Sequence, residues 1–139
     1  HMLQKAIDFA MKALEGQTSE NGEPYINHSL RIMDQMDTDT EKIVAVLHDV
    51  LEDSPRSIYD LKELGMSREI IDCVEQLTRK NDMTYFEYID DIATNDICTK
   101  IKLAEINDNK DISRVRKLSF QTYSVEKRCE KVREILTNR

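Results

Sequence analysis

Hydrophobic residues recur at helical spacing along the whole chain. Residues 2–15 show the pattern well, because apolar side chains there return every three or four positions and share one face. They are Leu3, Ile7, Ala10, Met11 and Leu14. Capping and turn residues separate further stretches of the same kind. The spacing predicts helices at 2–15, after Pro24, from the capping-box pair Thr38 and Glu41 to Asp53, near 57–64, after Ser67, within 81–95, within 96–114 and at about 118–137.

The composition supports a helical fold. Three glycines and two prolines among 139 residues leave little turn chemistry for sheets. The length suits a single hydrophobic core. We therefore predict an all-α fold with one compact domain over residues 1–139, a bundle of about seven or eight helices. His1 is expected to be a cloning remnant and is left out of the functional interpretation.

The charge and hydropathy of the chain argue against two classes of partner, nucleic-acid duplexes and membranes. A net charge of −7 with 34% charged residues argues against binding a nucleic-acid duplex, because such binding depends on an excess of Lys and Arg. A local basic pocket for a small phosphorylated ligand stays compatible with this charge. Apolar runs fall far short of the ~20 residues that a membrane span needs, so we expect no membrane partner.

The cysteines indicate a reducing compartment. Cys73, Cys98 and Cys129 are odd in number and far apart, which is the pattern of neither a disulfide framework nor a zinc site. We expect them to be buried as small apolar residues in a cytoplasmic protein.

One stretch, VLHDVLEDSP, carries an unusual group of polar residues. The predicted helix there ends with His48, Asp49, Glu52 and Asp53, which share one side at i, i+3 and i+4 spacing. A helix C-terminus disfavours carboxylates by ~0.3–1 kcal/mol each. A basic side chain, a bound cation or both should therefore compensate them. The plain alternative is a solvated acidic face.

Imidazole and carboxylate groups together suit a first-row divalent metal. His28, on the preceding helix, is placed to face the same ion, since a short connection makes those two helices neighbours. The alternative is a hydrogen-bonded core histidine. Glu105 follows an apolar pair in IKLAEINDNKDISR and is a second candidate ligand, unless it belongs to a polar helix face that reaches water.

These segments carry a family resemblance. GEPYINHSLRIM, VLHDVLEDSP, VEQLTRK, YFEYIDDI and IKLAEINDNKDISR, in this order over about residues 16–114, resemble the HD-domain metal-dependent phosphohydrolases. They are most similar to the branch of the alarmone hydrolases, the guanosine 3′,5′-bis(diphosphate) 3′-pyrophosphohydrolases and their single-domain relatives. The resemblance implies a helical HD-domain bundle that hydrolyses a small phosphorylated nucleotide.

The resemblance also implies a metal site. It holds one divalent ion, with manganese expected and iron, zinc, cobalt and magnesium as alternatives. His28, His48 and Asp49 match the first three ligands. Glu105 stands where the family has the Asp of its KLAD segment, and it is longer by one methylene. A glutamate can still ligate there if the ion or the backbone shifts by about one C–C bond length.

Further residues match the catalytic and substrate-binding positions of the family. Glu52 and Asp53 match the pair that positions and activates the attacking water. Lys102 matches the lysine of KLAD, and Asn109 matches an asparagine that lines the nucleotide pocket. Arg114 is expected to hold phosphates, whereas Lys110, Arg116 and Lys117 are expected to be surface charges.

The loop GQTSENGEPY departs from the family. Ser19 and Glu20 stand where the alarmone branch carries a basic pair that contacts the guanine base. Three hypotheses therefore remain open. The first is a metal-dependent phosphohydrolase of an alarmone or another nucleotide, the second a non-catalytic nucleotide-binding or regulatory module, and the third a purely structural helical protein. The long last helix is expected either to close the pocket or to form a homodimer.

Overall fold

A computed structural model describes residues 1–19, 22–115 and 130–138, with the backbone alone for 109–115. The regular secondary structure of these residues is helical, and β pairing among them is limited to an isolated bridge between Thr18 and Pro24. The predicted all-α fold is confirmed. The chain divides into two compact units, His1–Thr78 and Arg79–Arg139. One domain over the whole chain therefore stays a prediction.

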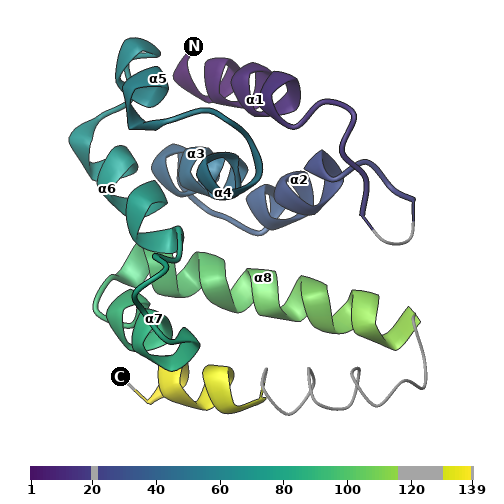
Figure 1. The fold of residues 1–139 in the computed structure, drawn as a ribbon, viewed down its shortest axis with the longest axis vertical. Coiled ribbons are helices and arrows are strands. Elements are labelled where there is room, and N and C mark those ends of the chain that lie inside the picture. The colour runs from purple at the N-terminus through teal and green to yellow at the C-terminus, as the bar shows by residue number, and fades with distance from the viewer. Residues whose placement is uncertain (20–21, 116–129, 139) are drawn as a thin grey trace. The chain divides into compact units, whose positions relative to one another are not determined.

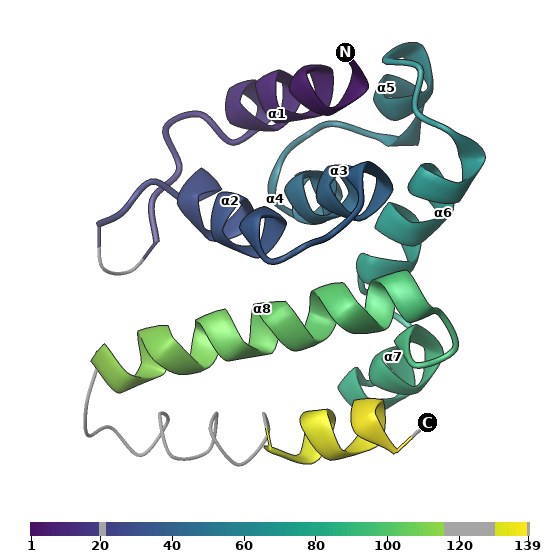
Figure 2. The ribbon, with the colours of Figure 1, turned by 180° about the vertical axis from the view of Figure 1, so that it is seen from behind.

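The first unit is built around one buried helix. Its elements are α1 (Met2–Ala13), α2 (Ile26–Asp34), α3 (Asp39–Leu47), α4 (Val50–Asp53), α5 (Ile58–Glu63) and α6 (Arg68–Leu77). Helix α3 packs against α1, α2 and α6, as Figures 1 and 2 show from opposite sides. Its residues from Ile43 to Leu47 are all buried. The chain thus enters the region of His48 directly from the core of this unit.

The ends of the helices follow the predicted capping residues. The Thr38 side chain accepts a hydrogen bond from the Glu41 N–H, and the Glu41 carboxylate accepts one from the Thr38 N–H. Ser67 caps α6 by accepting from the Ile70 N–H. Both caps confirm helix starts that were expected from side-chain type alone.

The apolar face of α1 differs from the prediction at one residue. Met11 was placed inward, but 49% of it is exposed. The fully buried positions of α1 are Ala6 and Ala10. Small side chains at these positions let α1 lie close to α3. The buried face of α1 is therefore centred on the two alanines, and Met11 lies outside it.

The predicted single helix from Thr38 to Asp53 is wrong. Helix α3 ends at Leu47, and the four-residue helix α4 begins at Val50. Asp49 between them has φ −96° and ψ −6°, a sparsely populated region where active-site residues are often found. The carboxylates therefore do not lie at the C-terminus of one long helix. The helix dipole therefore gives no reason for a compensating cation here, whereas the burial of Asp49 does.

The second unit contains α7 (Tyr85–Ile92) and α8 (Asp96–Val115), which contact each other. Residues 130–137 are also helical, and the Arg133 side chain donates a hydrogen bond to the Asn107 side chain. The remainder of the predicted last helix, residues 118–129, lies outside the described residues. Its role in closing a pocket or forming a homodimer stays a prediction.

Cys73 in α6 of the first unit and Cys98 in α8 of the second unit are both buried. Neither forms a disulfide, as the sequence predicts, and Cys129 lies outside the described residues. A search of the described helices finds none that is long and apolar enough to cross a bilayer.

Candidate metal centre

Three predicted ligands of the first unit converge in its interior. His28 comes from α2, and His48 and Asp49 form the junction between α3 and α4. The Oδ2 atom of Asp49 lies 3.2 Å from Nε2 of His48 and 3.6 Å from Nε2 of His28. All three side chains are at least nine-tenths buried. The two imidazole rings are 5.7 Å apart between centroids, tilted by 55°.

The main chain fixes the orientation of His48. Its Nδ1 lies 2.5 Å from the carbonyl oxygen of Ala45, one turn earlier. A carbonyl oxygen only accepts, so Nδ1 carries the proton and donates it. This bond turns Nε2 toward Asp49, the arrangement in which a histidine presents its second nitrogen to a metal. A side-chain bond to the backbone also competes with the helical ladder, which fits the end of α3 at Leu47.

The buried atoms of this cluster fit a divalent cation. Oδ2 of Asp49 accepts no hydrogen bond from the described residues, although such a buried oxygen is costly to leave unpaired. Ligand atoms ~2.1 Å from a shared ion lie about 3–3.5 Å from one another, close to the two measured separations. One nitrogen or oxygen atom from each of His28, His48 and Asp49 lies within 4.8 Å of the others. A cation, or a proton on an imidazole, is needed among these groups.

The predicted catalytic pair extends the cluster toward the surface. Glu52 and Asp53 lie in the single turn of α4, and their carboxylate oxygens come within 4.8 Å of each other and of Asp49. Asp49 is buried, Asp53 is half-buried and Glu52 is exposed. The three carboxylates therefore run from the interior to the surface. A purely structural protein with a solvated acidic face would expose all of them.

The second unit contains the other predicted ligand in a different setting. Nζ of Lys102 lies 2.8 Å from Oε2 of Glu105, one turn later on α8. The ammonium also lies 5.0 Å from the ring centroid of Tyr88 on α7, a cation–π arrangement. The Lys102 side chain is 9% exposed and that of Glu105 15%. Glu105 thus does not lie on a polar helix face that reaches water, which was the alternative to its role as a ligand.

The charge of Glu105 keeps Lys102 protonated. Burial by itself would lower the pKa of the Lys102 ammonium. The negative charge of Glu105, and after it the interaction with Tyr88, outweigh burial and raise that pKa above its ordinary value. Helical spacing alone gives no sign of this role for Tyr88.

The other predicted substrate-binding residues cannot be placed by their side chains. The side chains of Asn109, Lys110 and Arg114 lie outside the described residues, as do Arg116 and Lys117 entirely. In the loop before α2, Ser19 is described and Glu20 is not. Lys102 is described, and its contacts are with Glu105 and Tyr88.

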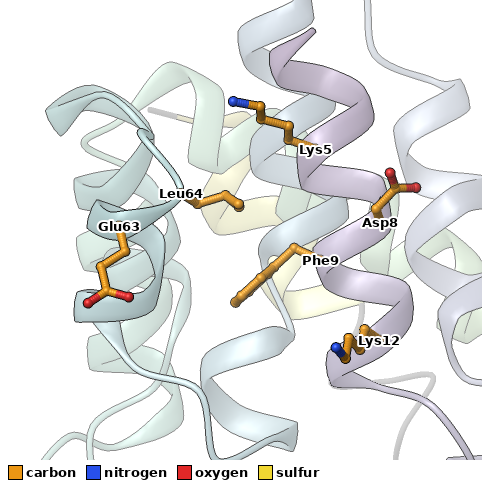
Figure 3. Close-up of a pocket in the computed structure, with 6 residues that line it drawn as sticks. All are labelled: Lys5, Asp8, Phe9, Lys12, Glu63 and Leu64. Carbon is orange, nitrogen blue, oxygen red and sulfur yellow. The ribbon is translucent and has the colours of Figure 1, made fainter.

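A separate pocket of about 390 Å³ lies between α1 and α5. Figure 3 shows Phe9 on α1 and Leu64 at the end of α5 pointing toward each other across it. Two basic and two acidic side chains complete the lining: Lys5, Lys12, Asp8 and Glu63. The mixed charges give this pocket no clear preference for an anion or a cation, and the predicted site residues are not among those that line it.

Comparisons with known proteins agree with the resemblance, although no protein-family model matches the chain. The bifunctional (p)ppGpp synthase/hydrolase SpoT of Escherichia coli K12 is 34% identical over 87 residues, 60% of this chain and 12% of that protein. The guanosine-3′,5′-bis(diphosphate) 3′-pyrophosphohydrolase of Haemophilus influenzae is 43% identical over 76 residues, 50% of this chain and 11% of that protein. The chain thus spans only a small part of the length of these relatives.

A solved structure provides a match over nearly the whole chain. It is a metazoan ortholog of SpoT that hydrolyses ppGpp, with a TM-score of 0.83 and 20% sequence identity. The match covers 97% of this chain and 85% of the other. The resemblance that the motifs indicate is therefore confirmed: in sequence the chain is related to proteins named as (p)ppGpp hydrolases, and in fold it matches the solved SpoT ortholog.

Proposed function

We propose that this protein is a metal-dependent pyrophosphohydrolase of a small phosphorylated nucleotide, with guanosine 3′,5′-bis(diphosphate) as the first candidate substrate. The observation that carries the proposal is the buried meeting of His28 and His48 with Asp49, whose Oδ2 accepts no hydrogen bond from the described residues. Related proteins are named as hydrolases and, in one case, as a bifunctional synthase/hydrolase. Metal ligands beside a carboxylate pair favour hydrolysis, because that reaction needs an activated water.

In this proposal His28 and His48 bind the ion through Nε2 and Asp49 through its carboxylate. Glu105 is assigned as a further ligand on the family resemblance alone. Manganese is the expected ion, and iron, zinc, cobalt and magnesium are the alternatives. When bound, such an ion neutralises phosphoryl charge and lowers the pKa of a coordinated water.

Glu52 and Asp53 then act on the water. Glu52, which is exposed to solvent, takes the proton from the attacking water, and Asp53 orients that water beside it. The water oxygen forms a bond to phosphorus as the bond from that phosphorus to the leaving oxygen breaks. Most of the rate gain in such transfers comes from positioning and charge neutralisation, which suits a site of fixed carboxylates.

Substrate binding is assigned to Lys102 and Asn109 on the resemblance, and to Arg114 on its positive charge. The base specificity stays open, since Ser19 and Glu20 replace the basic pair that contacts guanine in the alarmone branch. Another phosphorylated nucleotide is therefore the rival substrate within the same mechanism.

A second candidate function is a non-catalytic nucleotide-binding or regulatory module. The observation that favours it is the ion pair between Glu105 Oε2 and Lys102, which gives this candidate ligand a partner within the chain. A protein that binds nucleotide and manganese without turnover would have this function.

The proposal places the protein in the cytoplasm with a small nucleotide as its partner. The described cysteines, Cys73 and Cys98, are buried and form no disulfide, which suits a reducing compartment. A homodimer formed through the last helix is kept as a prediction only.

The test is hydrolysis by metal-stripped protein that is supplied again with manganese. The panel contains guanosine 3′,5′-bis(diphosphate), nucleoside mono- and triphosphates and adenosine 3′,5′-phosphates, with products separated by ion exchange. We expect Asp49→Asn to be inactive, and Asp8→Asn, on the exposed face of α1, is its matched control.

Release of diphosphate from the alarmone by the wild type and Asp8→Asn, but not by Asp49→Asn, supports the proposal. Cleavage of a different nucleotide keeps the mechanism and changes the substrate. Manganese binding without any turnover replaces the hydrolase by the binding module.

A further inference from the structure

Gln17 is held in place by the main chain on both sides of a loop. Its N–H donates to the carbonyl of Leu14 at 3.1 Å, and its carbonyl accepts from the N–H of Tyr25 at 2.9 Å. Thr18 and Pro24 form a β-bridge directly beside it. Gln17 therefore lies where the loop between α1 and α2 closes on itself, and its main chain is restrained on both sides.

The side chain of Gln17 reaches the end of α4. Its Nε2 donates to the carbonyl oxygen of Asp53 at 2.5 Å, across 36 positions of sequence. Helix α4 has only four residues, and so short a helix has little stability of its own. The Ser54 hydroxyl donates to the Val50 carbonyl at 2.7 Å, a bond within the same turn. The bond from Gln17 instead ties this turn to a distant segment.

The same residue is connected to the candidate metal ligand on α2. Tyr25, which donates to Gln17, accepts from the N–H of His28 at 3.1 Å through its carbonyl. The rings of Tyr25 and His28 are 6.0 Å apart between centroids. A continuous set of contacts thus runs from Asp53 through Gln17 and Tyr25 to His28.

We propose that Gln17 is a positioning residue that holds the Glu52–Asp53 turn at a fixed place relative to His28. Its effect on catalysis rests on the proposed function, while its effect on α4 does not. Gln17 acts through the main chain of Asp53 and touches neither the ion nor the reacting water. Its loss should misplace the carboxylate pair and leave the three buried ligands where they are.

The contact with the Asp53 carbonyl requires a side chain that has the length of glutamine and a hydrogen-bond donor at its end. A carbonyl oxygen needs a donor, which methionine of similar length lacks. Glutamate has the same length and would place a carboxylate against the carbonyl. Gln17→Met therefore removes the bond, and Gln17→Glu replaces it with repulsion, so two variants of different character test one contact.

The experiment combines three measurements on the full chain. Amide hydrogen exchange at Asp53 and Ser54 reports on α4, because these N–H groups donate to Asp49 and Val50 within the turn. Titration with manganese gives the affinity of the metal site, and steady-state hydrolysis gives kcat and KM. Gln35→Met is the matched control, since Gln35 also donates to a carbonyl, that of Arg31, at an exposed site.

In both Gln17 variants we expect exchange at Asp53 and Ser54 to be at least about tenfold faster. We expect kcat to fall about 10–100-fold, as for other residues that orient catalytic groups. The manganese Kd and KM should stay within about threefold of the wild type, because the buried ligands are untouched. Gln35→Met should change none of these quantities.

Unchanged exchange in the Gln17 variants would overturn the inference, and so would a retained kcat in an active protein. An equal loss of manganese affinity and kcat would also overturn it, because general destabilisation of the unit would then explain the effect. Faster exchange in a protein whose wild type hydrolyses nothing in the panel would uphold the role of Gln17 in α4 and reject the proposed function instead.

Discussion

Asp49 and Lys102 are both buried charges, one in each compact unit, and their surroundings compensate them in different ways. Lys102 has an opposite charge at 2.8 Å, the Glu105 carboxylate. Asp49 Oδ2 faces two imidazole nitrogens at 3.2 and 3.6 Å and accepts no hydrogen bond from the described residues. The pair in the second unit is complete within the chain, whereas the cluster in the first needs a proton or a cation. That difference indicates where a metal would bind.

The largest effect is expected for Asp49→Asn, which removes the buried charge of the first unit. It keeps the shape of the side chain and removes its charge, so manganese loses an anionic ligand and hydrolysis should fall by about a thousandfold or more. The metal-free variant should be at least as stable as the metal-free wild type, because a costly buried carboxylate is gone. Activity assays and urea unfolding without metal check both parts. A clear loss of metal-free stability would show that the imidazoles already compensate Asp49.

Lys102→Met breaks the complete pair instead. Glu105, whose side chain is 15% exposed, would be left without its ammonium, which should lower the free energy of unfolding by up to about 3–5 kcal/mol. The double variant Lys102→Met/Glu105→Leu should recover most of that loss, because both charges are then removed. Urea unfolding of both variants provides the measurement, with exposed Lys131→Met as control. A double variant no more stable than Lys102→Met would speak against a self-contained pair.

Manganese should stabilise the wild type in proportion to its occupancy of the site. At 100 times its Kd the ion should add about 2.7 kcal/mol to the free energy of unfolding, and a chelator should remove this gain. Asp49→Asn should gain little under the same conditions, while Asp8→Asn should behave as the wild type does. Thermal melting with and without manganese checks this. An equal gain in Asp49→Asn would place the binding elsewhere.

Glu87 offers the mildest test, a charge at the surface that nearby backbone compensates. Its carboxylate accepts from the Thr84 N–H at 2.8 Å, and this bond, followed by the one with the Thr84 side chain, lowers the pKa of Glu87. A lowered pKa means that the carboxylate stabilises the fold above its ordinary value of 4.5 and loses this effect as the pH falls through the folded value.

Glu87→Gln should therefore be slightly less stable than the wild type at neutral pH, and the difference should shrink on acidification below 4.5. Urea midpoints of both proteins across this range measure it. A difference that grows in acid would contradict the assignment of the shift to the cap at the start of α7.

The sequence predicted those features that depend on neighbouring residues. The helix starts at Thr38 and Ser67 followed from side chains that bond to the backbone three residues on. The grouping of His28, His48 and Asp49 followed from helix connectivity and from the motifs, and the structure brings these side chains together. Their roles in binding and catalysis stay predictions.

Features that depend on distant or irregular contacts were missed. Helical spacing assumes a continuous helix, but the bond from His48 to Ala45 accompanies a break that the pattern does not show. Gln17 carries no signal of its own, since its partner lies 36 positions away. A helical pattern counts Tyr88 as an apolar residue, although its ring lies against the ammonium of Lys102.

The distribution of buried thiols has a consequence for the dynamics of the chain. Cys73 belongs to the first unit and Cys98 to the second, and each is at most 1% exposed. A thiol reagent can modify them only when the surrounding helices separate, so each labelling rate reports the opening free energy of its own unit. In a chain with Cys129 replaced by serine, the labelling rates of Cys73 and Cys98 could be measured separately. The ratio of these two rates would show whether the units open together or one before the other.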